Sequence, residues 1–156
     1  MQWAHFASGG AGGGMRWPNR HPHVLTAGMR RAQRSLAGFL PLIDWSRFRR
    51  RNLNDELALS LPGVKGFACG DDAQAVVWLL RSDALAKDGT VRRDAEPCRP
   101  RVIVPGLAPG RYRATSWDTE SGTTVSNWEA EADSGGLALH LPPLVTDVAV
   151  AVRRAE

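Results

Sequence analysis

The stretch Leu137-Ala-Leu-His-Leu-Pro-Pro-Leu-Val-Thr-Asp-Val-Ala-Val-Ala-Val152 contains two short runs in which larger apolar side chains occupy alternate positions. The Pro-Pro pair between the runs is typical of a turn. Alternation with a period of two indicates β-strands that each bury one face. This end of the chain therefore predicts an antiparallel sheet rather than helices.

Similar short runs, separated by turn-forming residues, extend upstream to about residue 53. The separators include Leu61-Pro-Gly63, Pro109-Gly110 and Glu120-Ser-Gly122, and residues 83–100 are predicted to be a polar loop. Many short strands in roughly 100 residues are typical of an immunoglobulin-like antiparallel β-sandwich, which we assign to residues 52–156. The predicted strands lie near 53–59, 64–69, 74–81, 101–104, 110–117, 123–131, 136–141 and 146–153.

Residues 1–51 have a different pattern. We predict a short apolar strand at 2–7, a Gly-rich loop at 8–25 and a helix that begins after Thr26 as its N-cap. One strand and one helix cannot enclose a core by themselves. A single βα unit is, however, the building block of a (β/α)8 barrel. We therefore expect residues 1–51 to be the last unit of a truncated barrel, and the chain to be the C-terminal part of a longer enzyme.

The charge distribution also divides the chain near residue 51. The first 51 residues hold nine Arg, no Lys and one acid, a balance of +8, whereas the remainder has a balance of −4. A basic segment can bind a polyanion, or it can complement an acidic surface of a neighbouring unit. No apolar run is long enough to cross a membrane, and the first residues do not have the pattern of a secretory signal.

The Gly-rich segment does not fit the known phosphate-binding patterns. A dinucleotide fingerprint would need glycine where Met15 stands, and no Gly-Lys-Ser/Thr occurs. Trp17 is a better candidate for a ligand contact, because an indole offers a flat apolar surface for a sugar ring and one N–H donor. The alternative is that Trp17 packs as core beneath the loop. Arg16 beside it offers planar donors for hydroxyl or carboxylate groups.

We find no complete catalytic set in the sequence. Retaining glycoside hydrolysis needs two opposed carboxyl groups, and the only acid before residue 52 is Asp44. The acids after it are interpreted as solvated or turn-stabilising groups, as in Asp71-Asp72 and Asp118. No metal site or cofactor is expected, since His21-Pro-His23 lacks an acidic partner nearby. The two cysteines, Cys69 and Cys98, are predicted to be free thiols.

Two segments carry a resemblance to a known family. Trp3-Ala-His-Phe-Ala-Ser-Gly-Gly-Ala-Gly-Gly-Gly-Met-Arg-Trp17 resembles the last barrel strand of clan A glycoside hydrolases, which include cellulase-like and mannanase-like enzymes of family five. Pro109-Gly-Arg-Tyr-Arg-Ala-Thr-Ser-Trp-Asp-Thr-Glu-Ser-Gly122 resembles a hairpin of the small β-sandwich that often follows these barrels. The resemblance implies a sugar cleft whose catalytic glutamates lie on earlier strands that this chain lacks.

The resemblance implies that this chain supplies one wall of a cleft for β-linked polysaccharide or oligosaccharide, and that it is inactive alone. The substrate-binding residues that we assign on this basis are Trp17, Arg16, His5, Asn19, His21 and His23. One alternative is a non-catalytic carbohydrate-binding sandwich that uses Trp117 and Trp128, although packing in the core is the favoured explanation for these residues. A second is nucleic-acid binding by the Arg-rich first 51 residues, which contain no recognised binding motif.

Overall fold

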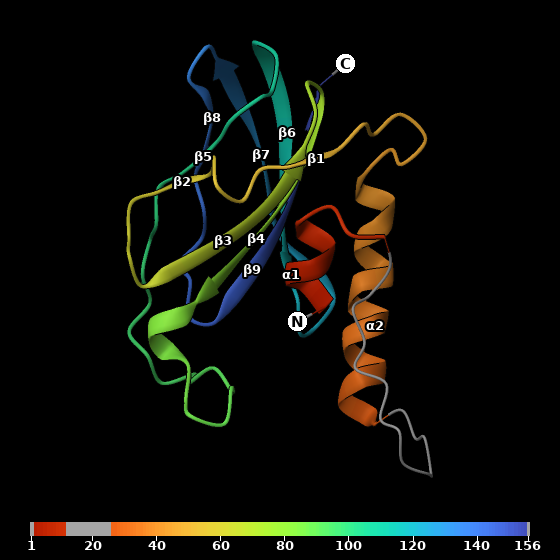
Figure 1. Ribbon diagram of the computed structural model, residues 1–156. Coiled ribbons are helices and arrows are strands. Elements are labelled where there is room, and N and C mark those ends of the chain that lie inside the picture. The colour runs from red at the N-terminus through yellow and green to blue at the C-terminus, as the bar shows by residue number, and fades with distance from the viewer. Residues whose placement is uncertain (1, 12–25, 156) are drawn as a thin grey trace.

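The computed structural model describes residues 2–11 and 26–155 (Figure 1). Nine antiparallel strands form one curled sheet in the order β1-β3-β4-β9-β6-β7-β8-β5-β2. The chain is therefore mainly β, as the sequence predicts. The strands are β1 (Arg51–Asn52), β2 (Ala58–Leu59), β3 (Val64–Gly70), β4 (Gln74–Arg81), β5 (Val102–Val104), β6 (Gly110–Asp118), β7 (Thr123–Asp133), β8 (Gly136–Leu139) and β9 (Asp147–Arg154).

The predicted strands after residue 60 are confirmed with small shifts at their ends. The prediction at 53–59 is largely wrong. Leu53 instead begins a turn, since its carbonyl accepts hydrogen bonds from the backbone N–H groups of Glu56 and Leu57. Only the two-residue strand β2 follows it. The apolar residues of this segment alternate because they pack against the sheet from a turn, not because they lie in one strand.

The inner surface of the curl encloses the larger core. Leu57 and Leu59 lie over Gly66 of β3, so the two ends of the curled sheet approach one another. Tyr112, Leu53 and Leu79 are among the largest fully buried side chains there. Burial of this many aliphatic side chains is the main stabilising contribution to the sheet.

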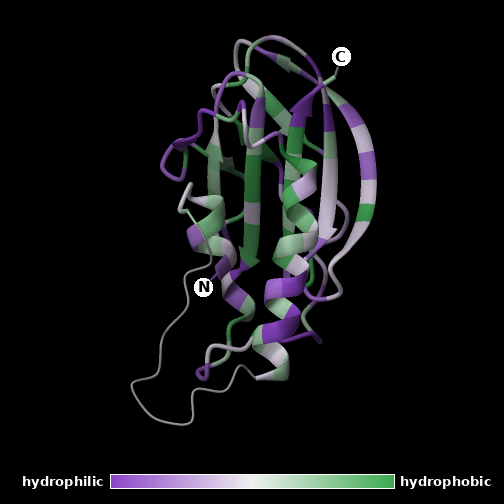
Figure 2. Ribbon diagram, turned by 90° about the vertical axis from the view of Figure 1, so that its right-hand side faces the viewer, coloured by the Kyte–Doolittle hydropathy of each residue, from purple (hydrophilic) through white to green (hydrophobic). Residues whose placement is uncertain are grey.

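A second core lies on the outer surface of the sheet, beneath the helices. The helical elements are α1 (Gln2–Ala7), α2 (Ala27–Phe39) and the 3-10 turn η1 (Leu40–Leu42), with a further 3-10 turn, η2 (Ser82–Ala84), after β4. Figure 2 shows α1 and α2 lying along the same face of the sheet. Their buried aromatic side chains pack against Val76, Trp78 and Trp117. Residues 2–11 and 26–50 therefore share a core with the strands.

Helix α2 begins as predicted. The Thr26 hydroxyl accepts a hydrogen bond from the Met29 backbone N–H at 3.2 Å, which is the geometry of an N-cap. Residues 2–7, in contrast, form a helix and not the predicted strand. Trp3, Phe6 and Ala7 follow helical spacing and are buried on one face. A six-residue apolar run does not distinguish a strand from a buried helix by its periodicity.

The two tryptophans near the β6–β7 hairpin lie on opposite faces of the sheet and do not pair. Trp117 pairs in register with Thr124, whereas Trp128 pairs with Ala114, because the register shifts between Ser116 and Trp117. Trp117 packs in the outer core and Trp128 against the inner core. Both cysteines are free thiols in the structure, with Cys69 buried and Cys98 half-buried.

Within the described ranges, none of the helices has both the length and the apolar composition that a membrane crossing requires.

Candidate functional site

His5 is the one predicted sugar-contact residue that lies within the described part of the chain. The other five, Arg16, Trp17, Asn19, His21 and His23, lie outside it. The His5 side chain is exposed on α1, and its ring covers Gly10 so closely that a Cβ at that position would overlap the ring. The Gly10 N–H donates to the His5 carbonyl at 3.0 Å. Glycine at position 10 is thus explained by the close approach of this ring.

Next to these residues, a groove of about 460 Å³ runs between α1 and α2. Phe6 of α1, Leu36 of α2 and Trp45 form its apolar walls. Gly10 and Ala11, at the start of the Gly-rich segment, line one end. Only the first residues of the Gly-rich segment, in which the sequence predicts the rim of a sugar site, belong to the described part of the chain, and Gly10 and Ala11 among them line this groove.

Trp45 is held in a fixed orientation within the groove. Its indole Nε1 donates a hydrogen bond to the Leu40 carbonyl at 2.7 Å. Its ring centroid lies 5.4 Å from that of Phe6 and 5.7 Å from that of Phe48. A half-buried tryptophan fixed in this way offers a rigid, flat surface whose orientation costs little entropy on binding.

Two polar side chains lie beside this aromatic surface. The Arg50 guanidinium lies over one face of the Trp45 ring, 5.9 Å from its centroid, so only the other face is left for a ligand, and the Arg50 Nε donates to the Gly9 carbonyl at 3.2 Å. The Gln2 side-chain oxygen is buried and has no hydrogen-bond partner within the described residues. A buried acceptor without a partner is costly. Gln2 also lines the groove, so a ligand hydroxyl group could donate to this oxygen once the amide turns toward the groove.

The groove contains no carboxyl group among its described lining residues. The nearest acid along the chain is Asp44, whose Oδ1 accepts from the Ser46 hydroxyl at 2.6 Å and whose Oδ2 lies 3.7 Å from Arg47 Nε. The hydrogen bond from Ser46, together with Arg47, lowers the pKa of Asp44. An acid with a lowered pKa is poorly suited to donate a proton near neutral pH.

Other acids of the sheet stabilise turns, as predicted. Asp71 Oδ1 accepts from the backbone N–H groups of Ala73 and Gln74, and Asp118 Oδ1 accepts from those of Glu120 and Ser121. Among the residues that the structure describes, no group of three or more His, Cys, Asp or Glu side chains is placed to hold a metal ion. The described lining of the groove thus offers aromatic side chains and hydrogen-bonding groups but no carboxyl group.

The sequence analysis missed Trp45 and Arg50 as candidate contacts. The six contact residues predicted from the sequence include neither of them. The sequence pattern that could have indicated them is an aromatic residue followed five positions later by an arginine in a turn. The same pattern is common in side-chain clusters that bind no ligand. Only the packing of α1 against residues 40–50 brings them to one groove.

Comparison of the sequence with protein-family models finds no match, and comparison with curated proteins finds no significant relative.

Proposed function

We propose that the chain forms the C-terminal, sugar-contacting part of a glycoside hydrolase-type protein and binds β-linked oligosaccharide or polysaccharide without cleaving it. The observation that carries this proposal is the rigid Trp45 surface in a groove at the start of the Gly-rich segment. Stacking of a sugar ring on an indole, with hydroxyl groups bonded to neighbouring amide and guanidinium groups, is a general mode of carbohydrate recognition.

The immunoglobulin-like character of the sheet is part of the proposal. Tyr112 supports it, because its hydroxyl lies 2.7 Å from the Ala108 carbonyl, four residues upstream. This resembles the tyrosine corner found in immunoglobulin-like sandwiches. The curled sheet would then act as an accessory unit that holds α1, α2 and the groove in place. The barrel origin of residues 1–51 is no longer part of the proposal, because the strand on which it depended is the helix α1.

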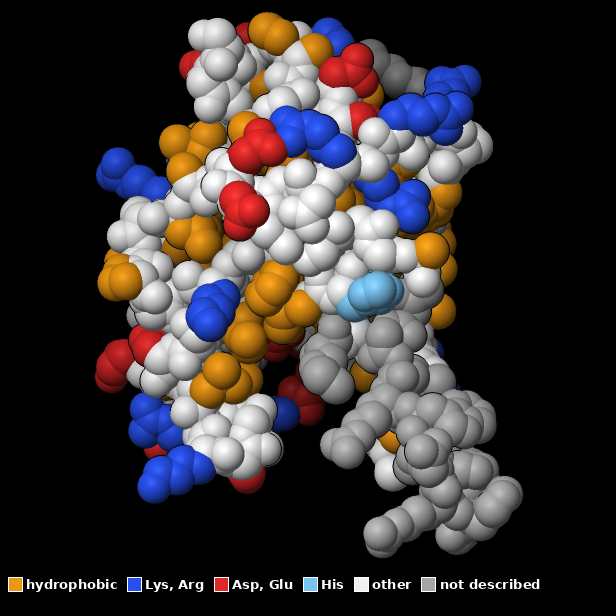
Figure 3. All heavy atoms as spheres, viewed as in Figure 1, with side chains coloured by type: hydrophobic (Ala, Val, Ile, Leu, Met, Phe, Trp, Pro, Cys, Tyr) orange, Lys and Arg blue, Asp and Glu red, His pale blue; other side chains and the backbone are white. Residues whose placement is uncertain are grey.

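The two alternatives receive less support from the geometry. Trp117 is 7% exposed, and the Trp128 indole nitrogen is buried, so neither offers an open stacking surface. Within the first 51 residues, Arg47 pairs with Asp44 and Arg51 with Glu56. Basic and acidic side chains also lie next to one another over much of the face in Figure 3. On the face that Figure 3 shows, the described side chains therefore do not form a continuous basic surface for nucleic acid.

Titration of the chain with neutral cello- and manno-oligosaccharides, followed by calorimetry, tests the proposal. We expect measurable binding, weakened at least tenfold by Trp45→Ala and by Gln2→Leu. Leu85→Ala, an exposed apolar residue after η2, is the control and should leave affinity unchanged. Circular dichroism establishes that each variant is folded. Absence of binding to every neutral glycan, or equal binding by the folded Gln2→Leu variant, would overturn the proposal.

A second measurement addresses catalysis. We expect the chain to release no reducing sugar from these oligosaccharides. Robust hydrolysis would contradict the assignment of a binding role without catalytic glutamates.

A further inference from the structure

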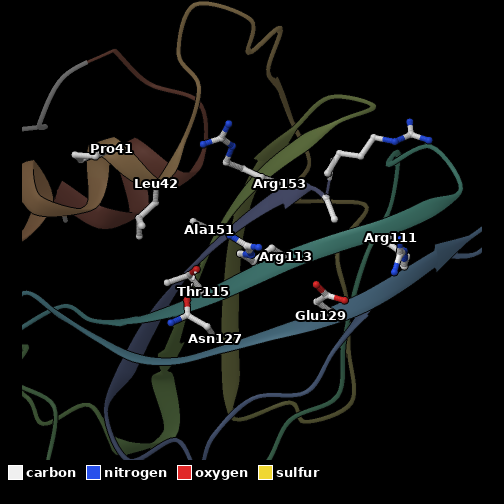
Figure 4. A pocket seen from close by; sticks show the side chains of 11 residues that line it. Pro41, Leu42, Arg111, Arg113, Thr115, Asn127, Glu129, Ala151 and Arg153 are labelled. Atoms are coloured by element: carbon white, nitrogen blue, oxygen red, sulfur yellow. Dashed lines mark hydrogen bonds between the residues drawn. The ribbon is translucent and has the colours of Figure 1, made fainter.

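A second cleft, of about 550 Å³, lies on the other side of η1 from the groove. Pro41 and Leu42 form one side of it, and the open surface of β9, β6 and β7 forms the other (Figure 4). The helices cover the apolar part of this outer surface and leave its polar end exposed. Four arginines line the cleft: Arg111, Arg113, Arg153 and Arg154.

Strand register concentrates this positive charge. Arg113 of β6 lies directly opposite Arg153 of β9, although like charges at opposed positions destabilise a sheet. On its other side, Arg113 lies opposite Glu129 of β7, yet the two side chains form no ion pair. Arg111 likewise lies opposite Glu131 of β7, so the acids of β7 offset part of the positive charge without closing to ion-pair distance.

Most of these arginines have no partner within the described part of the protein. The guanidinium groups of Arg111, Arg113 and Arg153 make no side-chain hydrogen bond or ion pair there, and Arg154 donates only to the Pro109 carbonyl, at 3.1 Å. Elsewhere in the chain, arginine side chains do pair with acids, as in Arg81–Asp83 and Arg93–Glu120. Guanidinium donors without partners around a cleft are suited to bidentate binding of oxyanions.

Neutral hydrogen-bonding groups form the floor between the charges. The Thr115 hydroxyl donates to the Asn127 side-chain oxygen at 2.7 Å, and this bond fixes the amide so that its nitrogen remains available as a donor. Thr115 is buried, so the floor is rigid. A ligand that fits carries both anionic groups for the arginines and hydroxyl groups for the floor.

We propose that this cleft binds an acidic polysaccharide through the carboxylate groups of its sugar units. The inference rests on the carbohydrate-binding function proposed above and adds a second, charge-selective site to it. Arg113 and Arg153 would bind one carboxylate between them. The Asn127 amide and the Glu129 carboxylate would hydrogen-bond neighbouring hydroxyl groups.

Glu129 favours such a ligand over nucleic acid. The Glu129 carboxylate in the cleft can accept hydrogen bonds from the hydroxyl groups that an acidic glycan carries on every sugar unit, whereas a nucleic-acid backbone presents mainly phosphate groups. The described lining also contains no aromatic side chain on which a base could stack. An acidic glycan has carboxylates separated by hydroxyl groups, which matches the mixed lining.

The test compares a hexamer of galacturonic acid with its fully methyl-esterified form, measured by calorimetry on the whole chain. We expect the acid to bind and the ester, which lacks the charge, to bind at least tenfold more weakly. The double variant Arg113→Gln/Arg153→Gln should lose at least tenfold in affinity. Arg99→Gln/Arg101→Gln changes the net charge equally at exposed positions away from the cleft and should change affinity less than twofold.

Glu129→Gln gives a test of opposite sign, since removal of the carboxylate should tighten binding of the acidic hexamer severalfold. Equal binding of acid and ester, or equal losses in the two arginine double variants, would overturn the inference. So would tighter binding of a single-stranded oligonucleotide that depends on Arg113 and Arg153. Neutral oligosaccharide binding that depends on Trp45 reports on the proposed function separately, so failure of one proposal is distinguishable from failure of the other.

Discussion

The indole N–H of Trp117 in β6 donates to the hydroxyl of Ser35 in α2 at 3.1 Å, and both side chains are buried. Gly38, one turn further along α2, lies so close that a Cβ there would be 3.1 Å from the Trp117 ring. The absence of a side chain at Gly38 thus lets the helix approach the sheet. This contact fixes the position of α2, and through it the positions of the groove and the arginine cleft on either side of η1.

Ser35→Ala is expected to lower the free energy of unfolding by about 1–3 kcal/mol, because it leaves a buried N–H donor without a partner. Trp117→Phe should lower the free energy of unfolding further than Ser35→Ala does, since it also removes buried volume. The double variant should lose less free energy of unfolding than the two single variants together, because it contains neither the indole N–H nor the hydroxyl and so leaves no polar group unpaired. Urea unfolding of the four proteins measures this coupling. Ser134→Ala, at an exposed position, is the control, and strict additivity of the first pair would argue against the hydrogen bond.

Gly122→Ala and Gly89→Ala form a matched pair that separates backbone strain from crowding. Both glycines have positive φ, +72° and +84°, but a Cβ at Gly122 would lie 3.1 Å from Ser35 Cα, whereas Gly89 has open space around it. The left-handed backbone costs an alanine about 1–2 kcal/mol at either site. We expect Gly122→Ala to lower the free energy of unfolding by ~1 kcal/mol more than Gly89→Ala does, because of the crowding. Thermal or urea unfolding measures both losses. Equal effects would show that α2 does not pack tightly on this turn.

Tyr112→Phe tests the corner at the start of β6. The Tyr112 hydroxyl lies 2.8 Å from the Asp72 carbonyl and 2.7 Å from that of Ala108, and the side chain is fully buried. Removal of the hydroxyl leaves both carbonyls without this donor, so we expect a loss of about 1–2 kcal/mol in the free energy of unfolding. A change below 0.5 kcal/mol would indicate that water replaces the hydroxyl and that the corner does not stabilise the fold.

The strands were largely predictable from the sequence, because each has its own turn formers and its own alternation of buried side chains. Helix α1 was not, since Trp3, Phe6 and Ala7 occupy so short a run that only packing on the sheet reveals their common face. The opposed faces of Trp117 and Trp128 were also unpredictable. They depend on a register shift in the hairpin that has no distinct sequence signal.

The arginine cleft is a candidate site that could not be predicted from the sequence either. Arg113 and Arg153 are 40 positions apart in the sequence and become neighbours only through the β6–β9 pairing. Strand order cannot be read from alternation alone, so the sequence gives no reason to place these two residues together. In the described part of the predicted basic region, residues 1–51, two arginines form ion pairs within the chain, Arg47 with Asp44 and Arg51 with Glu56.

Because Cys69 has a buried thiol, we expect the free energy of unfolding to depend on pH. Its thiol is 1% exposed, and burial raises its pKa to about 11 from an ordinary value of 9.0. Between these two pH values the folded state keeps a proton that the unfolded state has lost. The stability contribution is therefore fully present below pH 9 and decreases as the pH rises toward about 11, by as much as ~2–3 kcal/mol.

Urea unfolding at several pH values between 8 and 11 measures this decrease. The Tyr112 pKa is also raised by burial and contributes with the same sign, so the informative quantity is the difference between variants. Cys69→Ala should flatten the pH profile relative to the parent protein, whatever its effect on stability at pH 8. Cys98→Ala, which removes the half-buried thiol, is the control and should keep the parent slope. Parallel profiles for the parent protein and Cys69→Ala would show that Cys69 is reached by solvent in the folded state.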